Sequence, residues 1–173
     1  MGVSCEELVI HVDEPISSDA ALTAGLLHDI GQLWLCGYNP QVFRQALHTA
    51  HTCRVGVDVV ERDAFGVDHC TIGAWLAEHW GLPAGIVAAI RHHHDPDLGP
   101  KDALVAVVHV AEVMSNALDL AGRAENHVTA ISGQACDRLG LVWDDSIHAL
   151  FGRIEARSRH ASHFFALADS AAH

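Results

Sequence analysis

Apolar residues along the chain recur mostly at spacings of three and four positions, the spacing of one face of an α-helix. No stretch alternates apolar and polar residues for long enough to predict a half-buried β-strand. The pattern therefore predicts an all-α fold, a compact multi-helix bundle. The chain has 173 residues, 50% of them hydrophobic, which is enough for one core and too few for two domains. We expect an N-terminal lead-in over residues 1–20 and a single helical domain over residues 21–173.

Start and stop signals divide this pattern into separate helices. The segment around Pro15 is polar and poor in helix signals. A serine or aspartate at positions 17–19 can cap a first long helix that runs to about Cys36, and Pro40 follows its end. Further helices are expected over Pro40 to about His51, Val57–Phe65, His69–Trp80, Pro83 to the run His92–His94, Asp102 to about Leu120, Val128–Leu139 and Asp145–Ala168.

Charge and cysteine content narrow the classes of partner and compartment. The formal net charge of -12 repels phosphate backbones, so we expect no nucleic-acid partner. A small phosphorylated ligand stays compatible with this charge, because a bound divalent metal would invert the local field. The five cysteines are an odd number and form no C-x-x-C pair, which favours a reduced, cytoplasmic setting. We expect no signal peptide and no membrane span.

One acidic residue falls on the apolar face of the first long helix. At helical spacing, Asp29 shares a face with Leu22, Leu26 and Leu33. A buried carboxylate needs a partner, and a metal ion is one candidate because it keeps the acid ionised. The alternative is a hydrogen bond to a helix terminus or to a histidine. The dipeptide His28-Asp29, taken alone, favours that alternative.

Other residues with metal-ligating side chains shift the balance toward a metal. His69 begins a helix on its apolar face, although a buried histidine is often only a core residue. His93 and His94 end a helix, where a charge interaction with the helix dipole is the alternative role. Glu112 interrupts an otherwise apolar helix. Nitrogen and oxygen donors of this kind suit Fe, Mn, Zn or Ni, so we expect a divalent metal. The candidate ligands are His28, Asp29, His69, His93, His94 and Glu112.

Four short blocks of the sequence carry a family resemblance. They are Ala24–Gly31 (AGLLHDIG), Phe65–His69 (FGVDH), Trp80–Pro83 (WGLP) and His93–Pro96 (HHDP). In order and spacing they resemble the HD-related output domain, HDOD, a branch of the HD superfamily of metal-dependent phosphohydrolases. The resemblance implies an HD-domain-like helical bundle that acts as a regulatory module in bacterial signal transduction. It also implies a partner, either a signalling protein or domain or a second copy of the chain.

The resemblance extends to the related HD-GYP phosphodiesterases, whose ligand pattern maps onto the six candidate residues. In that mapping Asp29 bridges two metals and is the catalytic residue. Three features differ from hydrolytic relatives: the leading histidine has no match, since His11 is too close to the pair; Gln32 stands in place of a lysine; and Glu112 replaces an aspartate. The GYP-type segment is also missing. We therefore expect a regulatory HDOD module that binds metal with weak or no catalysis. The alternative is a metal-dependent phosphohydrolase or phosphodiesterase acting on a nucleotide or cyclic dinucleotide.

Overall fold

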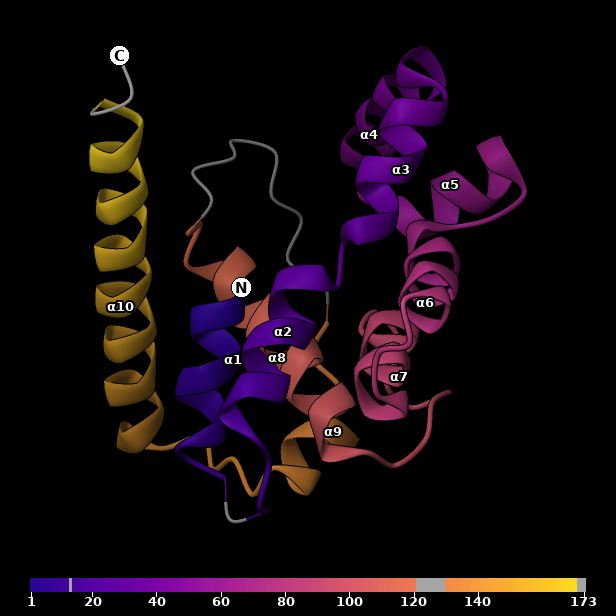
Figure 1. Ribbon diagram of the computed structural model, residues 1–173. Helices are drawn as coiled ribbons and strands as arrows, with labels where there is room; N and C mark the ends of the chain where they lie inside the picture. Colours follow the sequence, from indigo (N-terminus) through magenta and orange to yellow (C-terminus); the bar gives the residue numbers. More distant parts are fainter. Residues whose placement is uncertain (13, 121–129, 171–173) are drawn as a thin grey trace.

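The computed structural model describes residues 1–12, 14–120 and 130–170, and all regular secondary structure in these ranges is α-helical. This confirms the predicted all-α fold. The helices are α1 (Gly2–Val9), α2 (Ser18–Leu27), α3 (Ile30–Tyr38), α4 (Pro40–Cys53), α5 (Val57–Phe65), α6 (His69–His79), α7 (Ala84–His92), α8 (Ala103–Ala117), α9 (Gly133–Arg138) and α10 (Asp145–Ser170), as labelled in Figure 1.

The main core surrounds α8, which packs against α1, α2, α7 and α9 (Figure 1). Every residue of α8 from Ala103 to Ala111 is buried, as expected for a helix that is apolar on all sides. A second, smaller core joins α3, α4 and α6 through Leu35, Phe43 and Ile72. Figure 1 shows α3, α4 and α5 rising above the larger core, with α6 and α7 along one side of the molecule. The two cores therefore meet along α6.

The stretch expected as a lead-in contains a helix, α1. Cys5 and Leu8 on α1 are fully buried and belong to the main core. Helices α1 and α2 cross closely at Gly25, where a Cβ atom would lie 2.9 Å from the Cα of Gly2. Helix α1 has no start signal of the usual kind, because Met1 at its N-cap makes no side-chain hydrogen bond to the helix. The division into a lead-in and one domain stays a prediction.

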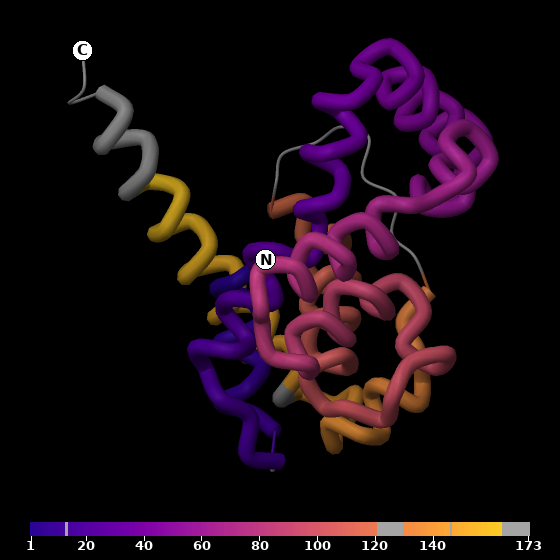
Figure 2. Tube along the Cα trace, turned by 45° about the vertical axis from the view of Figure 1, so that its right-hand side comes forward, coloured from indigo at the N-terminus to yellow at the C-terminus, as the bar shows by residue number. Residues whose placement is uncertain are grey.

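The single long helix predicted through Cys36 is wrong, because the chain turns between α2 and α3. Asp29 has φ -98° and ψ 12°, outside the helical region, and α3 leaves α2 in a new direction (Figure 1). Helix periodicity carries no signal for this turn, since the apolar spacing continues through it. Figure 2 shows the same change of direction from a second angle.

The turn also changes which residues of the first predicted helix are buried. Leu26 is 67% exposed and Leu33 is 71% exposed, whereas Gly31 and Leu35 are the buried residues of α3. The side chain of Asp29 is 36% exposed. The expectation that Asp29 lies on a buried apolar stripe is therefore wrong, because that stripe assumed one continuous helix.

Other predicted boundaries are confirmed. Helix α5 ends at Gly66, whose φ of 75° is readily adopted only by glycine. The carboxylate of Asp68 accepts a hydrogen bond from the backbone N–H of Thr71 at 2.7 Å and caps α6. Asp102 caps α8 in the same way. Helix α9 begins at Gly133, later than predicted, and the start expected at Val128 lies outside the described residues.

Helix α10 is held against α1 by charged side chains. Glu7, only 4% exposed, accepts hydrogen bonds from Arg153 at 2.9 Å and from Arg157 at 3.0 Å. Burial alone would raise the pKa of Glu7, but the two arginines outweigh it and hold the pKa below its usual value. Beyond this contact α10 extends away from the other helices (Figure 2). Within the described part of the chain, none of the helices is both long and apolar enough to cross a membrane.

Replacing Glu7 by Gln is expected to lower the free energy of unfolding by about 1–3 kcal/mol at neutral pH, because two arginines lose their charged acceptor. A lowered folded-state pKa contributes stability above the unfolded pKa, which is lost as the pH falls through the folded value. The difference between Glu7→Gln and the parent should therefore shrink below about pH 4.5. Urea unfolding from pH 7 to pH 3.5 measures this. Glu155→Gln, in an exposed pair with Arg159, should change stability by less than about 0.5 kcal/mol.

Candidate metal centre

Asp29 and three histidines converge where the α2–α3 turn meets α6 and the end of α7. Asp29 Oδ1 lies 3.4 Å from His69 Nε2 and 3.7 Å from His93 Nε2. Asp29 Oδ2 lies 3.3 Å from His28 Nε2. The turn at Asp29 therefore directs its carboxylate toward three imidazole nitrogens. The alternative to a metal, a hydrogen bond from a histidine to Asp29, would need a proton on His28 Nε2.

The remaining two predicted residues join this group through His94. His94 Nε2 lies 3.1 Å from His69 Nε2, and His94 Nδ1 lies 3.5 Å from Glu112 Oε2. Glu112 reaches the group from α8, on which it is the one acid of the buried segment. The structure thus brings all six predicted residues into one connected cluster. Their role as metal ligands stays a prediction.

Backbone carbonyls orient two of the imidazoles. His28 Nδ1 lies 2.9 Å from the carbonyl oxygen of Gly25, and His93 Nδ1 lies 2.8 Å from that of Ile90. A carbonyl can only accept, so in both histidines Nδ1 carries the hydrogen and Nε2 presents its lone pair. Histidine ligands of metals are usually held this way on the far side of the ring.

The sequence analysis missed Glu61, which orients His69. Glu61 is fully buried on α5, and its Oε2 lies 2.5 Å from His69 Nδ1 and accepts a hydrogen bond from the His69 backbone N–H at 2.8 Å. A carboxylate behind a histidine fixes the ring and raises its basicity as a ligand. The signal was present, because Glu61 shares the apolar face of α5 with Val57 and Phe65, four residues away on either side.

Cys70 is a second residue that the sequence analysis missed. Its Sγ lies 3.4 Å from His69 Nε2 and 3.9 Å from His93 Nε2. One donor atom each from His69, Cys70, His93 and His94 lies within 4.8 Å of the others. Burial raises the pKa of the Cys70 thiol, so without a metal it stays protonated. No C-x-x-C motif distinguished it from the other cysteines.

The cluster imidazoles at the end of α7 are neutral near pH 7. Burial lowers the pKa of His94 to about 4, and burial together with the charges of the neighbouring imidazoles lowers the pKa of His93 well below its usual value. A favourable charge interaction with the helix dipole would need protonated rings. The dipole role considered for these two histidines is therefore not supported, and their nitrogens keep lone pairs for a ligand.

The pKa values of His69 and Glu112, in contrast, are raised. Burial opposes protonation of His69, but the hydrogen bond to Glu61 and the charge of Asp29 raise the pKa of His69 overall. Burial raises the pKa of Glu112 well above its usual value, and the charge of Asp29 adds to this rise. The acids of the cluster therefore repel one another. A cation bound among these acids would reduce their mutual repulsion.

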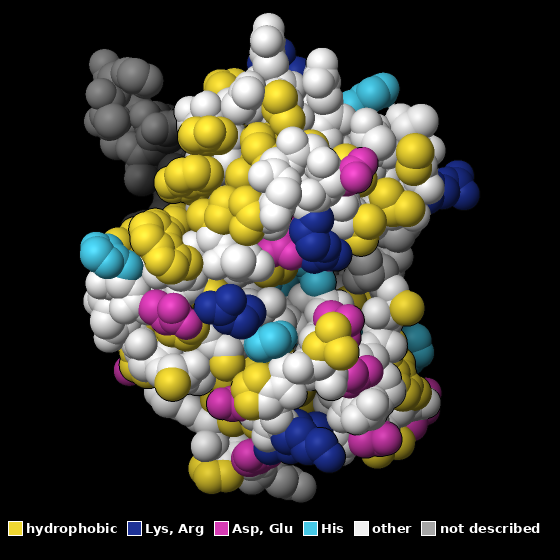
Figure 3. Space-filling model, turned by 90° about the vertical axis from the view of Figure 1, so that its right-hand side faces the viewer, with side chains coloured by type: hydrophobic (Ala, Val, Ile, Leu, Met, Phe, Trp, Pro, Cys, Tyr) yellow, Lys and Arg dark blue, Asp and Glu magenta, His cyan; other side chains and the backbone are white. Residues whose placement is uncertain are grey.

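One face of the outer surface carries different types of side chain in its upper part and across its middle. Figure 3 shows hydrophobic side chains gathered on the upper part, at the height of α3 to α5, and histidine, acidic and basic side chains across the middle. The exposed apolar residues of α3 include Leu33, Trp34 and Tyr38. The rings of Trp34 and Tyr38 stack at 5.0 Å.

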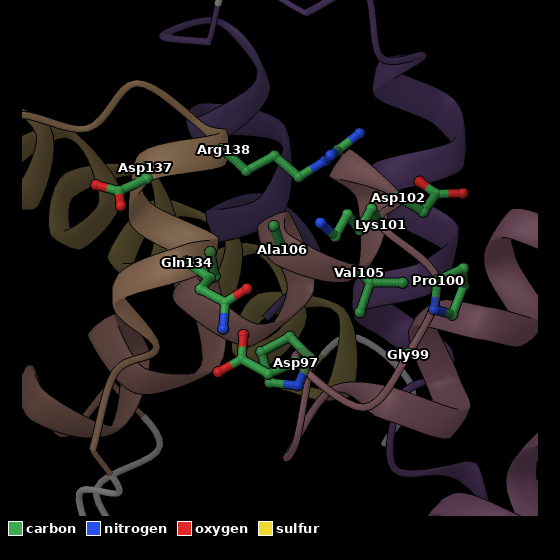
Figure 4. A pocket seen from close by; sticks show the side chains of 12 residues that line it. Asp97, Gly99, Pro100, Lys101, Asp102, Val105, Ala106, Gln134, Asp137 and Arg138 are labelled. Atoms are coloured by element: carbon green, nitrogen blue, oxygen red, sulfur yellow. The ribbon is translucent and has the colours of Figure 1, made fainter.

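A pocket of about 390 Å³ lies between the loop that follows α7 and helices α8 and α9. Figure 4 shows the side chains of Lys101 and Arg138 entering it from opposite sides. None of the six predicted ligands lines this pocket. It is therefore distinct from the cluster.

A chain of hydrogen bonds runs from the pocket wall to the cluster. Ser132 donates through its hydroxyl to Asp97 at 2.8 Å and through its backbone N–H to His109 Nε2 at 2.9 Å. His109 Nδ1 then donates to the carbonyl oxygen of His93 at 2.7 Å. The backbone that carries His93 is thus anchored from α8 and from the start of α9.

Comparison with known families agrees with the predicted resemblance. The sequence pattern of the HDOD domain matches residues 1–96. The chain belongs to the HDOD family. The match includes every predicted ligand except Glu112, and it begins at Met1 rather than near Leu22, where the resemblance was first seen. The HDOD pattern therefore includes α1.

Three solved structures share the fold. A structure named for signal transduction, from Marinobacter aquaeolei, has a TM-score of 0.70 and 25% identity, covering 93% of this chain and 37% of its own. An HDOD protein of Geobacter sulfurreducens has a TM-score of 0.69 and 24% identity over 91% of this chain and 59% of its own. A structure named as a phosphohydrolase, from Shewanella amazonensis, has a TM-score of 0.62 and 22% identity, and the match covers 92% of this chain and 56% of that protein's chain. They show the HDOD fold in longer chains.

Two kinds of curated relative match part of the chain. Ribonuclease Y of Thermus thermophilus is 32% identical over 125 residues, 71% of this chain and 17% of the relative. A Treponema pallidum protein without an assigned function is 27% identical over 109 residues, 62% of this chain and 21% of the relative. The chain thus spans about a fifth of the length of these relatives.

Proposed function

We propose that this HDOD domain is a regulatory module of bacterial signal transduction that binds a divalent metal at the cluster around His69 and His93, with little or no catalysis. One observation carries the proposal. Imidazoles anchored through Nδ1 present their Nε2 atoms to one another and to the carboxylate of Asp29, within 3.7 Å. Imidazoles anchored through Nδ1 beside a carboxylate are the arrangement that metal sites in proteins use.

The chemistry of the donors fits a first-row transition metal. Imidazole nitrogen and carboxylate oxygen suit Fe, Mn, Zn or Ni. A bound metal would neutralise the mutually repelling acids and, where a coordination position stays open, polarise an oxygen ligand. Asp29, His69 and His93 would hold it, with Glu61 fixing the ring of His69 from behind. His28, His94 and Glu112 complete the proposed set.

Burial of the cluster favours a regulatory role over hydrolysis. His69 and His93 are fully buried, and Asp29 is the cluster residue with substantial exposure, at 36% of its side chain. Hydrolysis of a phosphate ester needs room for the ester and positive charge beside it. Gln32, on the first turn of α3, offers a neutral amide instead. The alternative, a metal-dependent phosphohydrolase or phosphodiesterase, is supported by the match to ribonuclease Y.

The proposed partner of the module is a signalling protein or domain, or a second copy of the chain. Exposed apolar side chains on α3 support an association surface, since Leu33 is 71% and Tyr38 is 70% exposed. A small phosphorylated ligand stays a second proposal, with Asp29 as the part of the cluster that such a ligand could reach.

Metal content tests the proposed site. Protein purified without a histidine tag is expected to contain close to one equivalent of a transition metal per chain, measured by plasma mass spectrometry. His69→Ala should lose it, because this residue lies at the centre of the cluster. His79→Ala, on the exposed face at the end of the same helix, should keep the metal and serves as the control.

The same preparations test catalysis. With metal bound, the protein should not hydrolyse cyclic dinucleotides or a generic phosphodiester above the rate of His69→Ala. Metal-dependent hydrolysis that Asp29→Asn abolishes would favour the phosphodiesterase alternative. A chain that folds but contains no metal, and takes none up from a buffered supply, would overturn the proposed metal centre.

A further inference from the structure

Two different donor atoms approach the central pair of imidazole nitrogens. His69 Nε2 and His93 Nε2 lie 3.4 Å apart. Asp29 Oδ1 approaches both, at 3.4 and 3.7 Å. Cys70 Sγ also approaches both, at 3.4 and 3.9 Å. A metal held by the two nitrogens could therefore take its remaining ligands from the carboxylate or from the thiol.

The distances around Cys70 match the edges of a tetrahedral metal site. With Zn–N bonds of about 2.0–2.1 Å and a Zn–S bond of about 2.3 Å, a regular tetrahedron has N···N edges of about 3.4 Å and N···S edges of about 3.6 Å. The N···N distances from His69 to His93 and His94 are 3.4 and 3.1 Å. The N···S distances from Cys70 are 3.4 and 3.9 Å. These four separations are thus near those of ligands on one metal, and one donor atom from each of the four residues lies within 4.8 Å of the others.

We propose that Cys70 is a metal ligand, and that Cys70 Sγ with one nitrogen each of His69, His93 and His94 forms a closed site for a thiolate-binding metal such as Zn²⁺. This inference rests on the proposed metal centre; it keeps these three histidines as ligands, puts Cys70 in place of Asp29 and assigns the metal class. The resemblance to HD phosphodiesterases supplies no cysteine at this position. The assignment comes from the convergence of the four donors within 4.8 Å of one another.

A thiolate ligand changes what the site can hold. Soft sulfur donors select zinc, iron or copper over magnesium, calcium and manganese. Formation of the site releases the thiol proton to solvent as the Zn–S bond forms, with no change of oxidation state. Four protein ligands leave no position for water or substrate, which is the property of a structural zinc site.

The position of the four ligands explains what such a site would stabilise. His69 and Cys70 begin α6, and His93 and His94 follow the last turn of α7. Helices α6 and α7 pack against each other, and α6 also carries the contact with α3. A metal at this point joins the open end of the α6–α7 pair beside the α3 contact. Metal occupancy would therefore set the stability of the surface that α3 to α5 present.

Cobalt substitution tests the sulfur ligand. Metal-free protein titrated with Co²⁺ is expected to develop thiolate-to-cobalt charge-transfer absorption in the near ultraviolet and the intense visible bands of tetrahedral cobalt. Cys70→Ser, which keeps the volume of the side chain, should lose the near-ultraviolet band and bind zinc about 100-fold more weakly or worse. Cys136→Ala, another buried cysteine on α9, should behave as the parent. Asp29→Asn should keep the charge-transfer band.

The outcomes separate this inference from the proposed metal centre. Cobalt binding without a thiolate band, or a band that persists in Cys70→Ser, would reject Cys70 as a ligand. Neither result would contradict the proposed metal centre. Failure of the parent to bind cobalt or zinc would reject both. If Cys70→Ser does not fold, X-ray absorption of the zinc-loaded parent decides, since one sulfur at about 2.3 Å is expected and a shell of only nitrogen and oxygen would contradict it.

Discussion

Gly31→Ala is expected to lower the free energy of unfolding by about 3 kcal/mol or more and to abolish metal binding. A Cβ atom on Gly31 would lie 2.0 Å from the carbonyl oxygen of His69 and 2.9 Å from the backbone nitrogen of Gly73. Both are backbone atoms of α6 that no rotamer change can move. The methyl group would push on the backbone of His69 and force α3 and α6 apart, and the displacement of His69 and Cys70 at the start of α6 would disrupt the proposed metal site.

Denaturant unfolding of the metal-free proteins and zinc titration measure the two effects. Gly37→Ala on the same helix is the matched control, because a Cβ atom there meets nothing within 4 Å. That change should be neutral or should stabilise the protein by up to about 1 kcal/mol, since alanine favours the helix. A Gly31→Ala protein as stable as Gly37→Ala would show that the α3–α6 contact is not as close as the structure has it.

Glu61→Ala is expected to lower the free energy of unfolding of the metal-free protein by about 3–5 kcal/mol, the usual cost of removing one partner of a buried charged pair. The side chain is fully buried and serves both the ring and the backbone N–H of His69. Without it the ring can rotate, and the raised pKa of His69 should fall because the hydrogen-bonded carboxylate is gone. Metal affinity should also weaken by about 10–100-fold.

NMR titration of the His69 ring, zinc titration and urea unfolding measure these three effects. Asp63→Ala, which removes an exposed acid from the same helix, should change stability by less than about 0.5 kcal/mol. Glu61→Gln keeps the size of the side chain and should lose less stability than Glu61→Ala. Equal zinc affinity in Glu61→Ala and the parent would show that His69 is not a ligand or does not need the carboxylate.

Local signals in the sequence predicted those helices whose ends carry special residues. Gly66 ends α5 with a positive φ, and Asp68 caps α6, as expected from their residue types. Helix α1 carries no such signal, and its existence depends on packing against α2, α8 and α10. Short helices without caps are stabilised mainly by tertiary contacts, so a local pattern cannot predict them.

The structure brings the predicted site residues together, their role as ligands stays a prediction, and the reason given for Asp29 was incorrect. Asp29 was expected on a buried stripe of one helix, and it lies instead in a turn between two helices, with 36% of its side chain exposed. His69 was correctly expected at the start of a helix, on its inward side. Glu61 and Cys70 were missed because neither belongs to a family motif. The spacing of Glu61 on the apolar face of α5 was a signal for its burial, but the contacts of both residues with His69 are seen only in the structure.

By itself, the sequence determined the all-α class, most helix boundaries and the HDOD family, because these depend on residue type and on spacing along the chain. Only the tertiary structure decided which donors converge. His69 and His93 are 24 positions apart, and Glu112 reaches His94 from a third helix. Convergence across helices depends on how closely their backbones approach, as at Gly31, and periodicity along one helix carries no information about that distance.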